Sequence, residues 1–327
     1  PRMRAFFLEF CMNPWTSFWQ QGHSTTFGPF FSGGYEGAVK NWWLKTLKSQ
    51  NTTADLLDIG CGNGALVIPT LDVLKSGSYC GIDLADVKLS APAAKLAQAN
   101  PNFSARLLSK VPAESLPFDD NSFDLACSVY GVEYSNMDQA TCEIYRVLRV
   151  NGQFHALMHS TESVITEMTA RALREYKDED MAKILESLNT IDGELNRLKS
   201  PAGLKSSLDA EAARERLNAL AHKHMSNLDP KTGNAIMVQF VGDSLKYFKI
   251  LKQSQEVRAD YLNGLQREFA ASRERYTAMA QAAKSTEEIN TVVESLKTIG
   301  FKTAAAERFY SDLEQKELAA WQVCATK

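Results

Sequence analysis

The sequence predicts an α/β protein built on a Rossmann-like sheet of seven mostly parallel strands, with a large helical insertion between the fifth and sixth strands. Three observations support this fold class. Short strand-like runs alternate with helix-like segments over residues 51–160, residues 161–284 have almost no strand signal, and residues 285–327 return to one helix and two strands. Strands that alternate with helices are typical of a parallel sheet covered on both faces.

The central region contains five apolar strand-like runs and three helix-like segments. The expected strands are residues 55–59, 78–83, 103–108, 123–129 and 152–159, and the expected helices are residues 65–74, 86–99 and 137–148. Within the second of these helices, Pro92 is acceptable only near the first turn or as a kink, because proline lacks a backbone N–H.

The last region has a clear helix start and stop. Ser285 and Glu288 have the spacing of a capping box, and Gly300 is expected to end the helix that follows. Residues 301–310 and 318–326 then read as two strands. This closing hairpin would add antiparallel strands at one end of the sheet.

Two further regions lie outside the strand-and-helix pattern. Residues 1–50 are rich in aromatic residues and are interpreted as an N-terminal cap, whereas residues 161–284 read as a run of amphipathic helices. Leu262, Leu265 and Phe269 belong to a short heptad-like seam within these helices. The helical region either packs on itself as a subdomain or serves as a lid or dimerisation arm over an active site, and the two readings are compatible.

Composition excludes several classes of protein. The chain has 327 residues, 44% apolar and 23% charged, which are the values of a globular protein. A net charge of −3 gives no case for a nucleic-acid partner, since phosphate-binding surfaces need clustered Lys and Arg. No apolar run approaches the roughly 20 residues of a membrane span, and the N-terminus lacks the apolar length of a secretory signal.

The six cysteines include no C-x-x-C pair, so no zinc or other metal site is expected. Reduced thiols are the simplest account of them, and we therefore expect a cytoplasmic location.

The segment Asp58-Ile-Gly-Cys-Gly-Asn-Gly64, between the first strand and the first helix, predicts a small-ligand site. Glycines let the backbone turn tightly and approach a ligand, and the helix N-terminus offers free N–H donors. The loop alone is ambiguous, because Gly60, Gly62 and Ala65 also satisfy the dinucleotide fingerprint. Asp83 would hold ribose hydroxyls with either ligand.

Asp58 favours one of the two ligands. A carboxylate beneath the loop would repel a pyrophosphate, whereas it suits a ligand with a cationic amino group. S-adenosylmethionine carries an ammonium and a sulfonium, so the loop is interpreted as a site for this methyl donor.

The chain resembles class I S-adenosylmethionine-dependent methyltransferases, in particular the branch containing the ubiquinone/menaquinone-biosynthesis methyltransferases. The resemblance rests on the glycine loop and on four later segments in the same order, covering about 100 residues. The later segments are Gly81-Ile-Asp83, Ala113-Glu-Ser-Leu-Pro-Phe118, Ser122-Phe-Asp124 and Glu143-Ile-Tyr-Arg-Val-Leu148 through Gly152. It implies that residues 51–160 form a donor-binding core completed by residues 285–327.

The resemblance also implies a set of donor-binding residues and the product S-adenosylhomocysteine. Those at the methionine end are Asp58, Gly60, Cys61, Gly62 and Asn63; those at the ribose and adenine are Asp83, Leu84, Ala113 and Glu114; and those near the methyl group are Ser128 and Val129. One position departs from the family. Many members have an Asp before the alanine of the Ala-x-x-Leu-Pro-Phe segment, where this chain has Pro112, so Glu114 or a backbone carbonyl must meet the adenine amino group, or the adenine grip is weaker.

Candidate catalytic residues follow the fourth and fifth strands, because ligands on such sheets lie at the carboxyl ends of the strands. His159 is the first candidate for a base, and Glu133 and Tyr130 are further candidates. A base is needed only if the acceptor loses a proton. In the N-terminal segment, His23 and Tyr35 either belong to an aromatic staple packed on the core or reach into the donor pocket as part of a flap.

The leading hypothesis is therefore a methyltransferase that acts on a small-molecule acceptor. The alternatives are an NAD-dependent oxidoreductase, and a protein that binds S-adenosylmethionine and uses its helical region to engage a protein partner. The helical region also makes a homodimer possible.

Overall fold

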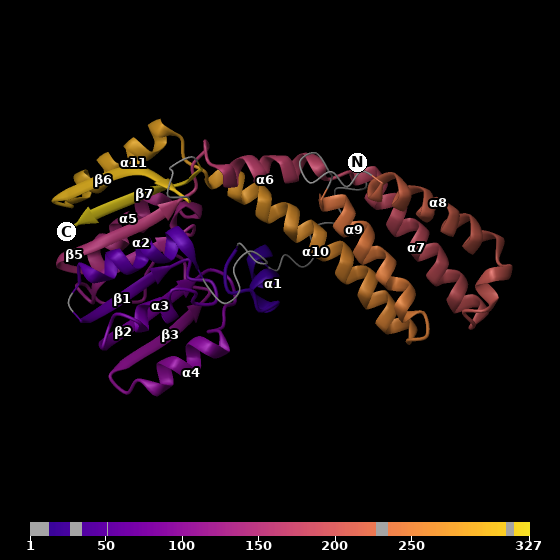
Figure 1. Cartoon of the computed structure of the whole chain (residues 1–327), viewed down its shortest axis with the longest axis horizontal. Coiled ribbons are helices and arrows are strands. Elements are labelled where there is room, and N and C mark those ends of the chain that lie inside the picture. Colours follow the sequence, from indigo (N-terminus) through magenta and orange to yellow (C-terminus); the bar gives the residue numbers. More distant parts are fainter. Residues whose placement is uncertain (1–12, 27–34, 51, 227–234, 312–316) are drawn as a thin grey trace. The chain divides into compact units, whose positions relative to one another are not determined.

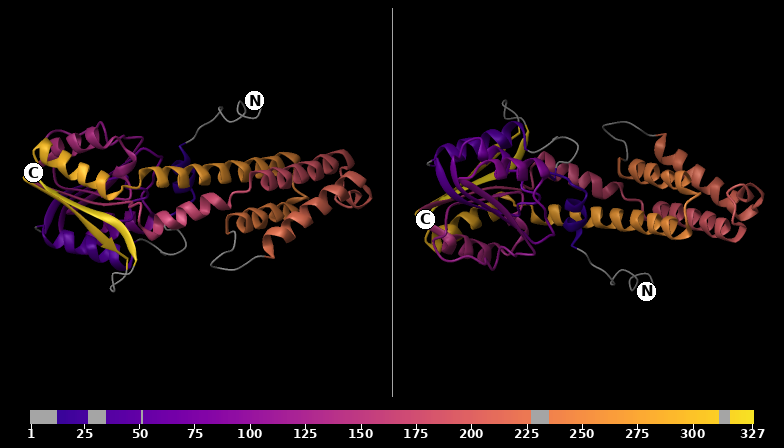
Figure 2. Two further views of the ribbon diagram at one scale, coloured as in Figure 1. Left: turned by 90° about the horizontal axis from the view of Figure 1, so that it is seen from above. Right: turned by 90° about the horizontal axis from the view of Figure 1, so that it is seen from below.

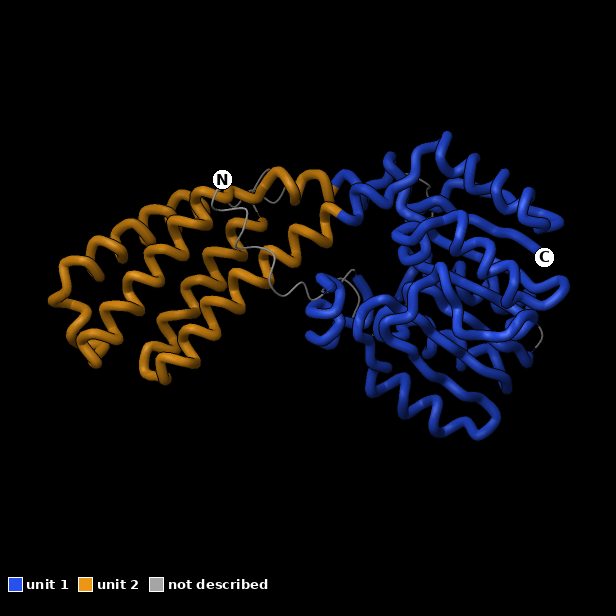
Figure 3. Tube along the Cα trace, turned by 180° about the vertical axis from the view of Figure 1, so that it is seen from behind, with its two compact units in different colours: residues 1–167, 278–327 blue, residues 168–277 orange. Residues whose placement is uncertain are grey.

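The computed structural model describes residues 13–26, 35–50, 52–226, 235–311 and 317–327. The chain forms two compact units. Unit 1 contains residues 1–167 and 278–327, and unit 2 contains residues 168–277 (Figure 3). Phe27, Phe30 and Phe31, which contribute to the predicted aromatic cap, lie outside the described residues.

Unit 1 is built on a seven-stranded sheet with the order β3-β2-β1-β4-β5-β7-β6 (Figure 1). The strands are β1 (Thr53–Ile59), β2 (Ser76–Asp83), β3 (Phe103–Ser109), β4 (Phe123–Val129), β5 (Leu148–Met158), β6 (Thr303–Tyr310) and β7 (Leu318–Thr326). The first five pair in parallel, whereas β7 is antiparallel to both β5 and β6. The predicted Rossmann-like, mostly parallel sheet of seven strands is confirmed.

Helices cover both faces of this sheet (Figure 2). The covering helices are α2 (Gly37–Lys48), α3 (Val67–Leu71), α4 (Ala91–Ala99), α5 (Met137–Val147) and α11 (Thr286–Ile299). Unit 1 also contains α1 (Pro14–Gln20) and the 3-10 turn η3 (Val132–Tyr134). Successive strand residues point to opposite faces. Leu57 and Phe154 pack with α5 and α11, whereas Leu56 and Leu157 pack with α2, α3 and α4.

Local signals set several helix ends. Ser285 and Glu288 form the predicted capping box of α11, and Gly300, with φ +124°, follows its last turn. The prediction was wrong for the start of two helices. α4 begins at Ala91, because Pro92 occupies the first turn and residues 86–90 are not helical. α3 is only five residues long, because the turns that follow the glycine loop occupy the residues before Val67.

Unit 2 is helical over its described residues. Its elements are α7 (Asp178–Leu198), η4 (Gly203–Ser206), α8 (Leu208–Met225), α9 (Ala235–Lys246) and η5 (Tyr247–Ile250), together with parts of α6 (Val164–Glu175) and α10 (Gln255–Ala282), which cross the boundary between the units. Leu188, Leu217, Phe240 and Phe269 belong to one buried cluster that draws on four of these helices.

A polar network also lies inside unit 2. Asp192 accepts hydrogen bonds from the Tyr247 hydroxyl and from Arg258 Nε, both at 2.6 Å. All three residues are buried, and a buried charge is tolerated because it is paired and hydrogen-bonded.

Among the described residues, no helix has the length and apolarity needed to cross a membrane.

Candidate functional site

The glycine loop at the end of β1 depends on backbone conformations that only glycine adopts easily. Gly60, Gly62 and Gly64 have φ values of +70°, +51° and +76°. A Cβ on Gly60 would lie 2.7 Å from the Cα of Gly131, so the chain must pass close there. The N–H groups of Gly60 and Cys61 donate to the carbonyl of Ile82, which fixes the loop to the end of β2.

The carboxylate of Asp58 lies buried beneath this loop. The Tyr79 hydroxyl donates a hydrogen bond to it, and burial raises the pKa of Asp58 to about 7. A small hollow of about 10 Å³ lies beside Asp58. Its lining residues are Tyr35, Asp58, Gly60, Cys61, Ala65, Leu66 and Val129. The fold therefore brings five of the candidate residues together, from the N-terminal region, β1, the loop and β4.

Asp83, at the end of β2, binds the glycine loop itself. Its carboxylate accepts hydrogen bonds from the N–H of Gly62 at 2.9 Å and the N–H of Ala85 at 2.8 Å. Burial raises the pKa of Asp83, although these two N–H donors act in the opposite direction. Leu84 beside it is 60% exposed, which is unusual for a large apolar side chain beside a buried strand end and leaves it open to a ligand.

Helix α1 lies against the glycine loop. Asn63 donates hydrogen bonds to the carbonyls of Trp19 and His23, at 2.9 and 2.8 Å, and accepts one from the N–H of Lys88. A Cβ on Gly62 would lie 2.6 Å from the Trp19 ring. The indole thus covers the loop, and sequence reasoning had not singled out Trp19 within the aromatic segment.

The two N-terminal candidates differ in how they meet the site. Tyr35 lines the hollow, and burial raises its pKa, assisted by the negative charges of Asp58 and Glu133. His23 contacts the loop through its backbone carbonyl, whereas its ring stacks on Phe18 with centroids 4.3 Å apart.

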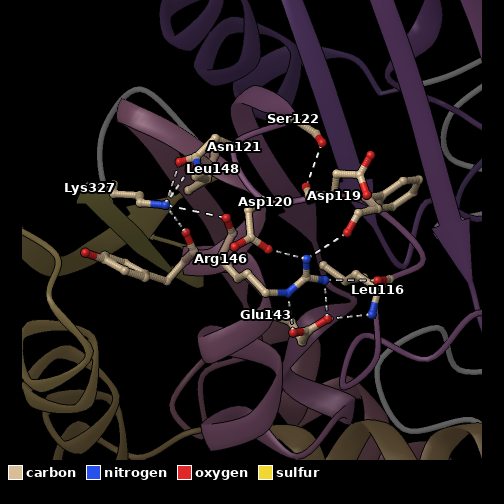
Figure 4. A network of polar contacts seen from close by, with 11 residues as sticks. Leu116, Asp119, Asp120, Asn121, Ser122, Glu143, Arg146, Leu148 and Lys327 are labelled. Carbon is tan, nitrogen blue, oxygen red and sulfur yellow. Dashed lines mark hydrogen bonds and ion pairs between the residues drawn. The ribbon is translucent and has the colours of Figure 1, made fainter.

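The segment that contains Ala113 and Glu114 is held against α5. Arg146 donates to the carbonyls of Leu116 and Phe118, at 3.0 and 2.7 Å, and pairs with Glu143 (Figure 4). Glu143 in turn accepts from the N–H of Leu116. The network fixes the backbone on the predicted adenine side.

The two candidate side chains of that segment are already placed by the fold. Ala113 is buried, and the Glu114 carboxylate accepts a hydrogen bond from the N–H of Asn136 at 2.7 Å. Asn136 is the N-cap of α5, so the Glu114 carboxylate lies at the N-terminal end of that helix. A negative charge is stabilised there by the positive end of the helix dipole. The carbonyl of Pro112 accepts from the N–H of Ser115 at 3.3 Å.

At the end of β4, Ser128 has a structural role. Its hydroxyl donates to the carbonyl of Ile59 at 2.7 Å and accepts from the N–H of Val132 at 2.8 Å. These bonds turn the chain sharply after β4, and Tyr130 has the unusual φ of +57° there. Strained residues of this kind cluster at functional sites.

The three catalytic candidates form one buried cluster. Glu133 accepts a hydrogen bond from the N–H of His159 at 2.9 Å, and the rings of Tyr130 and His159 lie with centroids 4.6 Å apart. The Tyr134 hydroxyl lies 3.1 Å from His159 Nε2. Two buried polar atoms of this cluster, Glu133 Oε2 and His159 Nδ1, have no hydrogen-bond partner among the described residues.

Burial changes the expected protonation of this cluster. It raises the pKa of Glu133 to about 7 and lowers the pKa of His159 to about 4. His159 is therefore neutral near pH 7, while Glu133 titrates close to that pH. Glu133 has the higher pKa of the two and is therefore the better proton acceptor near pH 7. The sequence had favoured His159 as the base.

Comparison with known proteins adds to this geometry. Residues 57–156 match the family model described as "Methyltransferase domain". The predicted resemblance to class I S-adenosylmethionine-dependent methyltransferases is confirmed by this match together with the curated relatives below.

The curated relatives share part of their length with this chain. Sterol 4-C-methyltransferase strm-1 of Caenorhabditis elegans is 26% identical over 154 residues, which are 42% of this chain and 45% of the relative. The ubiquinone/menaquinone biosynthesis C-methyltransferase UbiE of Xylella fastidiosa (strain 9a5c) is 46% identical over 50 residues, or 15% of this chain and 20% of the relative. The chain thus spans less than half the length of these curated relatives.

A solved S-adenosylmethionine-dependent methyltransferase from Methanosarcina mazei is 13% identical, with a TM-score of 0.37 over 86% of this chain and 96% of that chain. The segment that matches the family model begins within β1 and ends within β5, so it includes the glycine loop, Asp83 and Glu133. Tyr35 and His159 lie on either side of it in the sequence.

Proposed function

We propose that the protein transfers a methyl group from S-adenosylmethionine to a small-molecule acceptor. The observation that carries this proposal is the buried Asp58 carboxylate beneath the glycine loop, in the hollow that Tyr35 and Val129 also line. The Tyr79 hydroxyl already donates one hydrogen bond to this carboxylate, but a carboxylate has about four acceptor sites, and a cation would further offset the cost of burying its charge. The ammonium and sulfonium of the donor would supply this charge.

The donor would lie along the carboxyl ends of β1 and β2. Asp58 and the backbone of Gly60, Cys61, Gly62 and Asn63 would hold its methionine end. Asp83 would accept from the ribose hydroxyls through lone pairs that its bonds to Gly62 and Ala85 leave available, since a carboxylate has about four acceptor sites. Exposed Leu84 would contact the adenine, with Ala113 and Glu114 at its edge.

Donor entry requires movement of α1. The hollow of about 10 Å³ is far below the roughly 300–1,000 Å³ of ordinary small-molecule sites. The Trp19 ring lies against Gly62 of the glycine loop, and Asn63 holds α1 in place. Displacing the indole would enlarge the site, and its return over the sulfonium would be favoured by cation–π attraction.

Glu133 would accept the proton that the acceptor loses during transfer. Methyl transfer from a sulfonium needs alignment and exclusion of water more than it needs activation. His159, neutral and packed against Tyr130, would orient the acceptor through Nδ1. Ser128 and Val129 would border the transferred methyl group.

The named relatives are a sterol 4-C-methyltransferase and a ubiquinone/menaquinone biosynthesis C-methyltransferase, which supports a small apolar acceptor. We propose that residues 161–284 are a helical insertion between β5 and β6 of the family sheet and select the acceptor. In this proposal residues 1–50 are the cap, residues 51–160 the donor-binding core, and residues 285–327 its completion. A cytoplasmic location and a homodimer through the helical region belong to the same proposal.

Titration calorimetry tests the donor assignment. The protein should bind S-adenosylmethionine and S-adenosylhomocysteine and should not bind NAD⁺. Asp58→Asn should weaken donor binding by roughly 1–3 kcal/mol, because it removes a charge-assisted contact. Asp119→Asn, at an exposed aspartate, is the matched control and should bind as the unaltered protein does. Failure to bind either sulfur ligand would overturn the proposal, and binding of NAD⁺ alone would indicate an oxidoreductase.

A further inference from the structure

A second group of reactive side chains lies on unit 1 away from the glycine loop. Gln153 and His155 are two residues apart on β5, so their side chains share one face of the sheet. Cys324 on β7 is the direct cross-strand partner of His155. Cys324 Sγ lies 3.2 Å from His155 Nδ1, and His155 Nε2 lies 3.2 Å from Gln153 Oε1.

The directions of these hydrogen bonds follow from the neighbours of Gln153. Gln50 Nε2 donates to Gln153 Oε1 at 2.7 Å, which identifies that oxygen as an acceptor. His155 Nε2 must therefore carry a hydrogen and donate to it. In a neutral imidazole the other nitrogen is then bare, so Nδ1 accepts from the Cys324 thiol. Cys324, His155 and Gln153 thus form a thiol–imidazole–amide relay of the kind that activates cysteine nucleophiles.

The surroundings favour the protonated thiol at rest. Gln322 Nε2 lies 3.7 Å from the sulfur as a donor and is itself held by Glu307. Burial raises the pKa of Cys324, with Glu307 adding to the rise and Gln322 and Lys45 opposing it, while burial lowers the pKa of His155 to about 4. The resting pair is therefore neutral near pH 7, and the proton must pass to His155 while the sulfur attacks rather than before it. A thiolate of higher pKa is intrinsically the stronger nucleophile, which opposes the smaller fraction of thiolate at this pH.

A hollow of about 200 Å³ lies beside the relay. Its lining residues are Gln153, His155, Thr303, Ala304, Ala305, Cys324, Ala325 and Thr326. This volume is below the roughly 300–1,000 Å³ of sites for drug-sized ligands, so only a small molecule fits. The lining offers two threonines and three alanines beside the thiol and carries no Lys, Arg, Asp or Glu, which favours a small uncharged ligand.

We propose that Cys324 is a nucleophilic thiol that undergoes disulfide exchange with a small uncharged disulfide in this hollow. His155 Nδ1 takes the thiol proton as Sγ attacks one sulfur of the disulfide. The new Sγ–S bond forms while the S–S bond of the disulfide breaks, and its electron pair leaves with the departing sulfur. That sulfur receives the proton from His155, so the products are a mixed disulfide on Cys324 and one free thiol.

The test uses bis(2-hydroxyethyl) disulfide on the full chain at pH 7, with the modification rate of each cysteine followed by peptide mass spectrometry. Exposed Cys142 provides a reference thiol in the same molecule. Cys324 should react at least about tenfold faster than Cys142, although it is less exposed. His155→Gln should slow Cys324 at least about tenfold, the lower range of general-base assistance, and leave Cys142 unchanged.

Two results would overturn the proposal: Cys324 reacting no faster than Cys142, or an unchanged Cys324 rate in His155→Gln. Loss of the fold in that variant would be visible as reaction of the buried Cys61, Cys80 and Cys127. If His155→Gln does not fold, the variant Gln153→Leu tests the relay instead, because it removes the hydrogen-bond acceptor that keeps the hydrogen on His155 Nε2. It should slow Cys324 severalfold, and an unchanged rate would also refute the relay.

Discussion

The Tyr79 hydroxyl on β2 donates a hydrogen bond to the buried carboxylate of Asp58 on β1. This bond lowers the pKa of Asp58 against the larger effect of burial, which raises it to about 7. The charge beneath the glycine loop therefore depends on a residue from the neighbouring strand.

Removing this hydrogen bond should raise the pKa of Asp58 further. Because the pKa of Asp58 in the folded protein is about 7, its carboxyl group is mostly protonated and neutral below that pH. The affinity for a cationic donor should therefore increase as pH rises through 7 and Asp58 becomes charged. In Tyr79→Phe, this increase should move to higher pH. Calorimetric titration with S-adenosylmethionine from pH 6 to 9 measures it, with Tyr310→Phe on β6 as control. Coincident profiles for the unaltered protein and Tyr79→Phe would contradict the prediction.

The same pKa shift links Asp58 to stability. The unfolded chain loses this proton near the ordinary pKa of 3.8, whereas the folded chain keeps it until about pH 7. The contribution of Asp58 to stability is therefore fully present below pH 3.8 and is lost as pH rises to 7. Asp58→Asn should flatten the decrease in unfolding temperature between about pH 4 and 7. An equally steep decrease in this variant would show that Asp58 is not the group responsible.

Glu133→Gln should lower kcat by about 10²-fold or more, because it removes the proton acceptor while keeping the size of the side chain. The rate of the unaltered protein should rise as pH increases through about 7, the pKa of Glu133. This increase should be absent in the variant. Donor affinity should stay within about twofold. Steady-state assays with labelled donor measure both, once an acceptor is in hand. A lost donor affinity would instead assign Glu133 to donor binding.

Asn63→Ala should release α1 from the glycine loop, since it removes the hydrogen bonds to the carbonyls of Trp19 and His23. Hydrogen exchange of residues 14–26 should speed up by about fivefold or more, corresponding to roughly 1 kcal/mol of lost local protection. Asn102→Ala, at an exposed turn, is the control. Exchange that is unchanged in Asn63→Ala would mean that packing of Trp19 alone holds α1.

Arg146→Met should loosen residues 113–118 while preserving the aliphatic part of the side chain. It removes hydrogen bonds to two carbonyls and the pair with Glu143. Urea unfolding should show a loss of roughly 1–3 kcal/mol, discounted for the partial exposure of Arg146. Arg214→Met, which removes an exposed pair with Glu211 on α8, should cost clearly less, because solvent screens exposed ion pairs. Equal losses in both variants would contradict the special role of Arg146.

Sequence determined the features that depend on neighbours along the chain. Alternating apolar runs located the strands, Ser285 and Glu288 located the start of α11, and Gly60, Gly62 and Asp58 marked the loop within a few residues of one another. These signals are local because backbone conformation, capping and strand alternation operate over two to four residues.

Tertiary structure decided which polar groups lose water and which residues meet across long separations. Trp19 reaches Gly62 and Tyr79 reaches Asp58 from elements that one-dimensional spacing does not connect. The order of basicity of Glu133 and His159 was likewise invisible, because desolvation raises one pKa and lowers the other only after both are buried. The glycine loop was readable because its chemistry lies in consecutive residues, whereas the charges around it depend on the dielectric environment that packing creates.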